Sequence, residues 1–226
     1  MENDDARAPR NSEHDHTLND QIDSAVAVLR EGGVVALPTD TLYGLAASVF
    51  DGNAVERIYE IKGRPSGMAL PLLLAERTDF SRYATAVPEI AWRLIERFMP
   101  GPLTVVLERE PGVPGTVSGG LDTIALRMPD HWVPRAVARR LGSAITGTSA
   151  NRTGSPGLTT VDAVRRELGR DVDFIVDGGS LEGSIPSTVV DLTGPSPAIV
   201  RQGPVSRQAI EAVCGEQLVA VPTGGD

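Results

Sequence analysis

The segment from Gly33 to Pro65 limits the fold most strongly, because it carries signals for a strand, a loop and a helix in direct succession. The apolar run Gly33-Val34-Val35-Ala36-Leu37 has the composition of a buried strand. Pro38 interrupts that run, and the loop that follows, residues 38–45, contains two threonines, a tyrosine and a glycine. The segment therefore predicts a buried strand that ends in a loop rich in hydroxyl groups.

A helix is predicted directly after this loop. Asn53 can serve as its N-cap, and Glu56 follows three residues later, as in a capping box. The helix is expected to end at Lys62, because Gly63 permits a left-handed C-cap and Pro65 prevents continuation. Strand, polar loop and helix thus form one unit.

Two cations, Lys62 and Arg64, follow that helix with only Gly63 between them. In non-helical backbone, residues two apart point to the same side. Lysine offers a compact charge and arginine a planar fork, a pair that suits phosphate or carboxylate. In the alternative interpretation the two cations only offset the helix dipole, for a fraction of about 1 kcal/mol. The spacing leaves both interpretations open, and the preceding loop favours a binding site.

The rest of the chain continues this alternation of strands and helices, without a strict repeat. Further strands are predicted at 70–74, 103–107, 123–127, 143–146, 174–176, 187–192 and 198–201, and helices at 20–29, 87–98, 134–141, 160–168 and 206–213. Asn19 or Asp20 would cap the first helix. The pattern predicts one α/β domain, residues 17–213, with a twisted mixed sheet. Residues 1–16 are expected to be a disordered tail and residues 214–226 a flexible one.

Two later segments add polar groups to this scheme. The strand at 123–127 alternates, so that Thr123, Ala125 and Arg127 share one face. An arginine on a core strand is costly unless it meets an anion or lines a cavity, although an edge strand would let it face water. Residues 147–154 form a second hydroxyl-rich stretch after a strand, which is either a simple turn or a set of donors for anionic oxygens. The glycine-rich stretch 108–120 is consistent with a flap over a ligand or a long hairpin.

Composition excludes several classes of protein. The net charge of −9, from 21 Lys and Arg against 30 Asp and Glu, disfavours broad binding to nucleic acid. Cys214 is the only cysteine, so an intramolecular disulfide is impossible and a reducing compartment fits. The N-terminus lacks the features of a signal peptide, and no apolar run reaches membrane-spanning length. A cytoplasmic protein that does not bind membranes is therefore expected.

The sequence also lacks the motifs of several kinds of catalysis. It has no phosphate-binding loop of the Gly-x-x-x-x-Gly-Lys type, no dinucleotide fingerprint and no Gly-x-Ser-x-Gly elbow. His131 is the only histidine outside the N-terminal tail, which disfavours a Ser/His triad, and no Cys/His cluster predicts a metal site. The remaining hydroxyls, amides and cations at strand ends suit the positioning of anionic substrates.

Seven short motifs occur together in a fixed order, and their combination is specific where each alone is weak. In this order the chain resembles the YrdC-like family of L-threonylcarbamoyladenylate synthases, from about Leu18 to Val213. The motifs are Pro38-Thr39-Asp40-Thr41-Leu42-Tyr43-Gly44-Leu45, Lys62-Gly63-Arg64-Pro65, Pro100-Gly101-Pro102-Leu103-Thr104, Arg127-Met128-Pro129, Ser149-Ala150-Asn151, Ser187-Thr188-Val189-Val190-Asp191 and Arg201-Gln202-Gly203.

The resemblance implies a single YrdC-like α/β domain, in which a twisted mixed to antiparallel sheet, flanked by helices, surrounds a large concave cavity. It also implies a reaction in which L-threonine, bicarbonate and ATP, with magnesium, give threonylcarbamoyl-AMP and pyrophosphate. A tRNA threonylcarbamoyltransferase would then use the product to modify adenosine 37 of tRNA. Direct tRNA binding by this chain is expected to be weak, and no tightly bound cofactor is expected.

The resemblance assigns roles to residues that match the family's motifs. It implies that Lys62 and Arg64 are catalytic. The residues implied to contact ATP are Lys62, Ser66, Thr123, Asn151, Thr159 and Arg201. The residues implied to hold L-threonine are Thr39, Arg127, Ser149 and Ser187, with Arg127 on the carboxylate. The segment Gly67-Met68-Ala69-Leu70 departs from the family's Asp-x-Pro-Leu, so its contacts are not assigned.

Two competing hypotheses remain. A double-stranded RNA-binding or ribosome-assembly module would use the same cavity without nucleotidyl transfer, although the acidic net charge opposes it. A carbamoyltransferase-type domain would handle another carbamoyl-adenylate, but such domains work beside zinc-finger and acylphosphatase modules for which this chain has no room.

Overall fold

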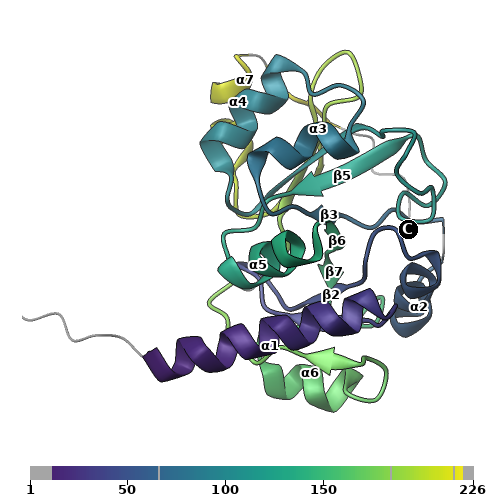
Figure 1. Cartoon of the computed structure of the whole chain (residues 1–226). Coiled ribbons are helices and arrows are strands. Elements are labelled where there is room, and N and C mark those ends of the chain that lie inside the picture. The colour runs from purple at the N-terminus through teal and green to yellow at the C-terminus, as the bar shows by residue number, and fades with distance from the viewer. Residues whose placement is uncertain (1–11, 66, 184, 216, 221–226) are drawn as a thin grey trace, which may run out of the picture.

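The computed structural model describes residues 12–220 except 66, 184 and 216. Helices and strands alternate along the chain (Figure 1), as the sequence predicts. In chain order the elements are α1 (Ser12–Arg30), β1 (Val35–Leu37), β2 (Gly44–Ala46), α2 (Gly52–Lys62), β3 (Leu72–Leu73), the 3-10 helix η1 (Arg77–Asp79), α3 (Phe80–Tyr83), α4 (Glu89–Phe98), β4 (Leu103–Glu108), β5 (Thr123–Arg127), α5 (Trp132–Leu141), β6 (Ile145–Thr146), β7 (Thr148–Ser149), α6 (Val161–Leu168), β8 (Phe174–Ile175), β9 (Thr188–Asp191), β10 (Ala198–Arg201), α7 (Arg207–Cys214) and β11 (Val219–Ala220).

The strands form two mixed sheets, where the sequence predicted one. The smaller has the order β7-β2-β1-β8 and the larger the order β11-β10-β9-β4-β5-β3-β6. Neighbouring strands are antiparallel in pairs such as β4 with β5, and parallel in pairs such as β4 with β9. The predicted mixed α/β fold is therefore confirmed, with the sheet divided in two.

The two sheets meet at Gly147, which links β6 in the larger sheet to β7 in the smaller one. A Cβ atom on this residue would lie 2.3 Å from the side chain of Leu73. Only glycine therefore allows the chain to pass between the sheets at this point. The backbone that follows Gly147 belongs to the hydroxyl-rich stretch noted in the sequence.

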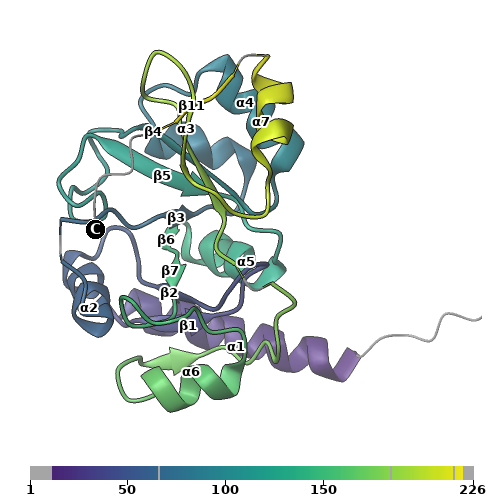
Figure 2. The ribbon, with the colours of Figure 1, turned by 180° about the vertical axis from the view of Figure 1, so that it is seen from behind.

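Helices cover the outer faces of both sheets. In Figures 1 and 2, α4 and α7 lie together at one end of the molecule, where α4 contacts β4. At the other end α1 packs against α5 and against β1 and β8. Within the described part of the chain, no helix is long and apolar enough to cross a membrane.

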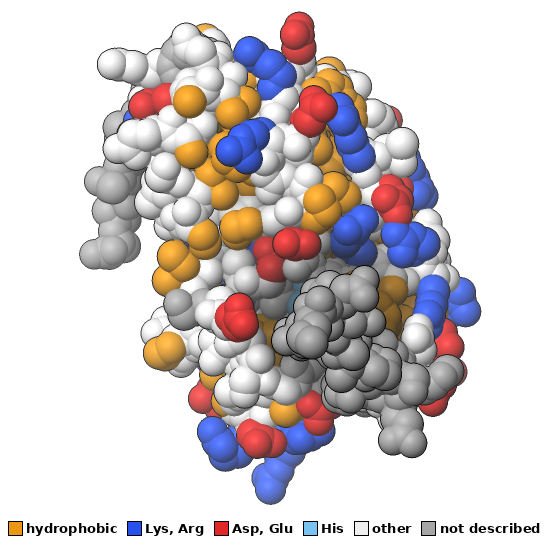
Figure 3. Space-filling view, turned by 90° about the vertical axis from the view of Figure 1, so that its left-hand side faces the viewer, with side chains coloured by type: hydrophobic (Ala, Val, Ile, Leu, Met, Phe, Trp, Pro, Cys, Tyr) orange, Lys and Arg blue, Asp and Glu red, His pale blue; other side chains and the backbone are white. Residues whose placement is uncertain are grey.

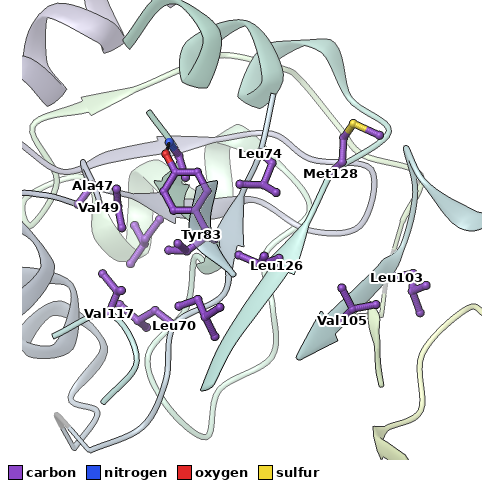
Figure 4. Close-up of a cluster of buried hydrophobic side chains, with 14 of the residues drawn as sticks. Ala47, Val49, Leu70, Leu74, Tyr83, Leu103, Val105, Val117, Leu126 and Met128 are labelled. Carbon is purple, nitrogen blue, oxygen red and sulfur yellow. Dashed lines mark hydrogen bonds between the residues drawn. The ribbon is translucent and has the colours of Figure 1, made fainter. Parts of the chain in front are cut away.

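The main core lies beneath the larger sheet (Figure 4). Leu103 and Val105 from β4 and Leu126 from β5 are fully buried in it. Each such side chain contributes about 1.5–3 kcal/mol by leaving water. Tyr83 also lies in this core, where its hydroxyl accepts a hydrogen bond of 2.6 Å from the backbone N–H of Ala144. The core thus fixes one face of β4 and β5 and leaves the other face free.

The structure corrects the predicted N-terminal boundary. Helix α1 begins at Ser12, ahead of the predicted caps Asn19 and Asp20. Residues 12–16 of the predicted disordered tail are therefore helical, and residues 1–11 lie outside the described chain. No glycine or proline occurs between Ser12 and Asn19, so the backbone has no reason to stop the helix there.

The cap of α2 was also predicted wrongly. Asp51 is the N-cap, and its carboxylate accepts a 2.9 Å hydrogen bond from the N–H of Ala54. Asn53 lies inside the first turn instead. Aspartate and asparagine cap helices about equally well, so the local pattern alone did not separate them. The predicted end is correct, because Gly63 takes a left-handed conformation (φ 58°) directly after Lys62.

The predicted flexible C-terminal tail is partly wrong. Gly215 turns the chain with φ 76°, and β11 then pairs in parallel with β10. Leu218 is buried against the core. The chain is thus part of the fold as far as Ala220, and residues 221–226 lie outside the described chain.

Candidate active site

A cavity of about 690 Å³ lies on the free face of the larger sheet, beside the point where the sheets meet. Its floor comes from β4, β5, β9 and β10. Its walls come from the loop after β1, the segment after α2 and the crossing at Gly147. This volume is typical of sites that enclose a small molecule, which range over roughly 300–1,000 Å³.

The strand pattern determines which side chains reach the floor. Ala125 and Arg127 of β5 line the cavity, whereas Ile124 and Leu126 are buried in the core on the opposite face. The predicted alternation of this strand is therefore confirmed. Thr123, which shares the face of Ala125, lies at the strand end and does not line the cavity.

Arg201 reaches the cavity because of an irregularity in β10. Ile199 pairs with Val190, but the next partner, Val189, pairs with Arg201. Val200 is therefore an extra residue in the strand, as in a β-bulge. Since Val189 lines the cavity, its cross-strand partner Arg201 is placed on the same side.

Lys62 lies at the end of α2 and is only 4% exposed. Its ammonium group donates to the backbone oxygens of Ser149 and Asn151, at 2.6 and 2.9 Å, and to the Oδ1 atom of Asn151 at 3.1 Å. All three N–H bonds are thereby used. Burial, together with the nearby charge of Arg64, lowers the pKa of Lys62 to about 8.

Arg64 and Arg201 also line the cavity. Arg64 donates from Nη2 to the carbonyl of Ala69 at 3.2 Å, but its Nε atom is buried without a partner. Burial lowers the pKa of both guanidinium groups, and the pKa of Arg201 is lowered further by repulsion from Arg127 and Arg64. Among the described residues, no carboxylate forms an ion pair with Lys62, Arg64 or Arg201.

Arg127, by contrast, is already paired. Its Nη2 atom lies 2.6 Å from Oδ1 of Asp40, and both side chains are largely buried. Its Nε donates to the carbonyl of Gly101 at 3.0 Å, and its Nη1 donates to the hydroxyl of Thr41 at 3.1 Å. The sequence left open whether Arg127 faces water or lines a cavity. The structure shows that it lines the cavity, with a carboxylate behind it.

The loop after β1 is ordered by its own hydroxyl groups. The hydroxyl of Thr39 donates to the carbonyl of Leu42 at 2.7 Å and accepts the N–H groups of Thr41 and Leu42. It also lies 3.0 Å from the hydroxyl of Thr41. Since Thr39 has used its only proton, Thr41 donates to Thr39 and accepts from Arg127. Thr39 therefore lines the cavity while it holds this loop in place.

Two serine hydroxyl groups form hydrogen bonds between residues that the resemblance assigned to different ligands. The hydroxyl of Ser149 donates to Oδ1 of Asn151 at 2.5 Å. The hydroxyl of Ser187 lies 3.2 Å from Nη2 of Arg201 and 2.8 Å from the hydroxyl of Thr104. Residues expected to bind two different molecules are thus in direct contact, so the two molecules would meet in one cavity.

The structure brings most of the predicted site residues together. Those that line the cavity are Thr39, Lys62, Arg64, Arg127, Ser149, Ser187 and Arg201. Asn151 lies directly behind this lining, where it binds Lys62 and Ser149. Thr159 does not line the cavity, and its neighbour Thr160 caps α6. Ser66 lies outside the described residues.

Two segments that the sequence left open also border this region. Gly67, Met68 and Ala69 line the cavity. The stretch 108–120 is anchored to its neighbours, because the hydroxyl of Tyr59 shares its one proton between the carbonyls of Met68 and Thr116, at 2.9 and 3.0 Å. The sequence assigned no role to Asp40, Thr41 or Thr104, which form hydrogen bonds with predicted site residues. All three lie inside the motifs that carry the family resemblance, and this position in the sequence was the only sign that they belong to the site.

Comparisons with known proteins agree with this geometry. A family model for Sua5, YciO and YrdC proteins, described as "Telomere recombination", matches residues 27–203. A Pyrococcus abyssi protein named threonylcarbamoyl-AMP synthase is 41% identical over 192 residues, which cover 85% of this chain and 56% of that protein. A Mycobacterium tuberculosis protein named putative threonylcarbamoyl-AMP synthase is 36% identical over 192 residues, covering 85% of this chain and 88% of that protein.

Solved structures agree as well. The structure of P. abyssi Sua5 complexed with L-threonine matches with a TM-score of 0.86 and 40% identity, over 89% of this chain and 59% of that one. This chain therefore spans a little over half the length of its Pyrococcus relative. The family model covers most of this chain, and the cavity is built from the motifs that the resemblance rests on. The chain belongs to the Sua5/YciO/YrdC family.

Proposed function

We propose that this chain is an L-threonylcarbamoyladenylate synthase, which makes threonylcarbamoyl-AMP and pyrophosphate from L-threonine, bicarbonate and ATP. Curated relatives carry the name threonylcarbamoyl-AMP synthase, and a related structure was solved with L-threonine. The observation that carries the proposal is that the cavity has both cations with no described carboxylate partner and an arginine paired with a carboxylate. Three cations that pair with no carboxylate in the described part of the chain line the same cavity as Arg127, which is already paired with Asp40.

The triphosphate of ATP would bind at Lys62, Arg64 and Arg201. Lys62 is buried, and none of the three side chains forms an ion pair with a described carboxylate, so together they attract a polyanion strongly. The unpartnered Nε atom of Arg64 gives a further donor. Lys62 would donate to a phosphate oxygen only in exchange for one of its present carbonyl partners, so its main contribution is its charge. The remaining proposed ATP ligands are Ser66, Thr123, Asn151 and Thr159.

L-Threonine would bind in the same cavity, with its carboxylate on Arg127. Three N–H bonds of this guanidinium point to Gly101, Thr41 and Asp40, which leaves two of its five donors for a substrate. Ser149 and Ser187 supply hydroxyl groups beside it, and Thr39 holds the adjoining loop.

The reaction then needs positioning more than a protein base. Bicarbonate condenses with the threonine amine to give a carbamate and water, and a carbamate oxygen attacks the α-phosphorus of ATP. The bond from that phosphorus to the bridging oxygen breaks, and pyrophosphate leaves. Lys62, Arg64 and Arg201 would stabilise the charge that develops on the phosphoryl oxygens. None of the described cavity-lining residues is an Asp or Glu, so magnesium would enter as part of the MgATP substrate.

Incubation with MgATP, bicarbonate and single amino acids, analysed by mass spectrometry, tests this proposal. We expect pyrophosphate and threonylcarbamoyl-AMP with threonine. Turnover with serine should be slower by about 10–200-fold, since one methyl group is worth roughly 1–3 kcal/mol. Absence of any carbamoyl-adenylate would contradict the proposal. A salt-sensitive shift of double-stranded RNA without such turnover would favour the RNA-binding alternative, although acidic side chains lie among the basic ones on the face in Figure 3.

The affinity for ATP should depend on pH through Lys62. A lysine carries its charge below its pKa, so with a pKa of about 8 the charge is present at neutral pH and lost as pH rises. We expect the Kd for MgATP to rise by up to tenfold per pH unit above about pH 8. In Lys62→Arg the charge persists at all these pH values, so its Kd should stay nearly constant. Equilibrium binding of ATP from pH 7 to 10 measures both profiles, and identical profiles would exclude Lys62 as the titrating group.

The product is a mixed anhydride of a carbamate and a phosphate, which water hydrolyses readily. We propose that it passes to a tRNA threonylcarbamoyltransferase in the cytoplasm, and that direct tRNA binding by this chain is weak. Net charge of −9 supports the last point, because tRNA binding depends on neutralisation of phosphates.

A further inference from the structure

Among the described carboxylates, Asp40 alone forms an ion pair with a cation that lines the cavity. Its Oδ1 atom lies 2.6 Å from Nη2 of Arg127, and its Oδ2 atom is buried without a hydrogen-bond partner. Thr39 and Thr41, on either side of Asp40, line the cavity, but Asp40 itself does not. Asp40 therefore acts on a ligand only through Arg127.

The environment of Asp40 leaves Arg127 as its partner. The guanidinium is fixed on its other sides by the carbonyl of Gly101 and the hydroxyl of Thr41. His131 lies near enough to feel the charge of Asp40, but its Nδ1 atom accepts the N–H of Val133 at the start of α5. Burial lowers the pKa of His131, so the imidazole stays neutral and does not compete for the carboxylate.

Without Asp40, none of the four cations that line the cavity would pair with a described carboxylate. Arg201 is close enough to Arg127 and to Arg64 to be repelled by both. A polyphosphate would then gain by reaching Arg127 as well, because charges in a buried site interact strongly. With Asp40 present, the Arg127 pair is neutral and offers two directed N–H donors, which suit one carboxylate.

We infer that Asp40 is a specificity-determining positioning residue, which reserves Arg127 for the amino-acid carboxylate and confines the phosphates to Lys62, Arg64 and Arg201. This inference rests on the proposed function and deepens it. The neutral pair separates two anion sites that share a single cavity. No role of this kind follows from the spacing of the motif in the sequence.

Binding of L-threonine to Asp40→Asn, with and without inorganic pyrophosphate, tests the inference by calorimetry. Asparagine keeps the shape and one acceptor but removes the charge. In the wild type, saturating pyrophosphate should leave the Kd for threonine unchanged within about twofold. In Asp40→Asn, threonine should bind at least tenfold more weakly, and pyrophosphate should weaken it at least another fivefold by occupying Arg127.

Two further variants serve as controls. Asp40→Glu keeps the charge and should stay insensitive to pyrophosphate. Asp173→Asn removes the exposed ion pair with Arg57, away from the cavity, and should bind threonine as the wild type does. If Asp40→Asn does not fold, as judged by circular dichroism, Asp40→Ser gives the same comparison, since a small side chain admits water beside Arg127.

The outcomes are distinguishable. The inference would be overturned if folded Asp40→Asn, or Asp40→Ser, bound threonine with wild-type affinity and pyrophosphate had no effect on that affinity. The proposed function would remain intact. A wild-type protein that binds no threonine and releases no pyrophosphate from ATP would instead overturn the proposed function. A small loss of stability with unchanged binding would mean that Asp40 has only a structural role.

Discussion

Replacement of Arg64 by alanine should reduce the release of pyrophosphate from ATP by at least 100-fold. Arg64 has a buried Nε atom without a partner and forms no ion pair with a described carboxylate, and we propose that it binds a phosphate of ATP. Loss of one preorganised donor to a developing negative charge lowers turnover by about 10²–10³-fold. A coupled assay of pyrophosphate at saturating threonine and bicarbonate measures this effect.

Two variants make the Arg64 result specific. Arg64→Lys keeps the charge and loses the fork, so part of the activity should remain. Arg57→Ala changes an arginine inside α2, the helix that precedes Arg64. Its exposed ion pair with Asp173 lies outside the cavity, so turnover should stay unchanged. Near wild-type pyrophosphate release from folded Arg64→Ala would exclude a catalytic role. Lys62→Ala should be equally inactive, but it also removes three hydrogen bonds to the oxygens of Ser149 and Asn151 and thus weakens the fold.

Replacement of Arg127 by alanine should raise the KM for threonine by roughly 100-fold or more, because two charge-assisted hydrogen bonds of about 1.5–3 kcal/mol each are lost. The KM for ATP should change only a few-fold, since Lys62, Arg64 and Arg201 remain. Steady-state pyrophosphate release, with each substrate varied in turn, separates the two constants. Equal increases in both would remove Arg127 from the threonine site.

This variant also tests the buried ion pair. Arg127→Ala leaves Asp40 as an unpaired buried charge, which should lower the free energy of unfolding by about 3–5 kcal/mol. In the double variant with Asp40→Ala both charges are absent, so stability should recover while the KM for threonine stays high. Urea unfolding measures the first quantity. If stability and KM recover together, the threonine effect of the single variant came from misfolding.

The sequence predicted the elements well because hydrophobic periodicity is a local property. The strand before Pro38, the helix that ends at Lys62 and the alternation around Arg127 all follow from neighbouring residues. The errors occurred where two local signals have similar strength, as with Asp51 and Asn53, or where a long-range contact decides. Leu218 and β11 belong to the fold only because β10 lies beside them.

The candidate site was predictable in composition but not in its arrangement. The motifs supplied Lys62, Arg64 and Arg127, but no local pattern pairs Asp40 with an arginine 87 residues away. Nor does sequence periodicity reveal the extra residue Val200, which turns Arg201 into the cavity. Thr123 and Thr159 were named by resemblance, and neither lines the cavity. Thr123 is the first residue of β5, and Thr159 directly precedes the N-cap of α6.

A crystal structure of the protein with both L-threonine and a non-hydrolysable ATP analogue is the most direct test of this account. We expect both molecules in the one cavity, with the threonine carboxylate on Arg127 and the phosphates among Lys62, Arg64 and Arg201. Phosphates bound to Arg127, or the two molecules bound in separate places on the protein, would contradict it.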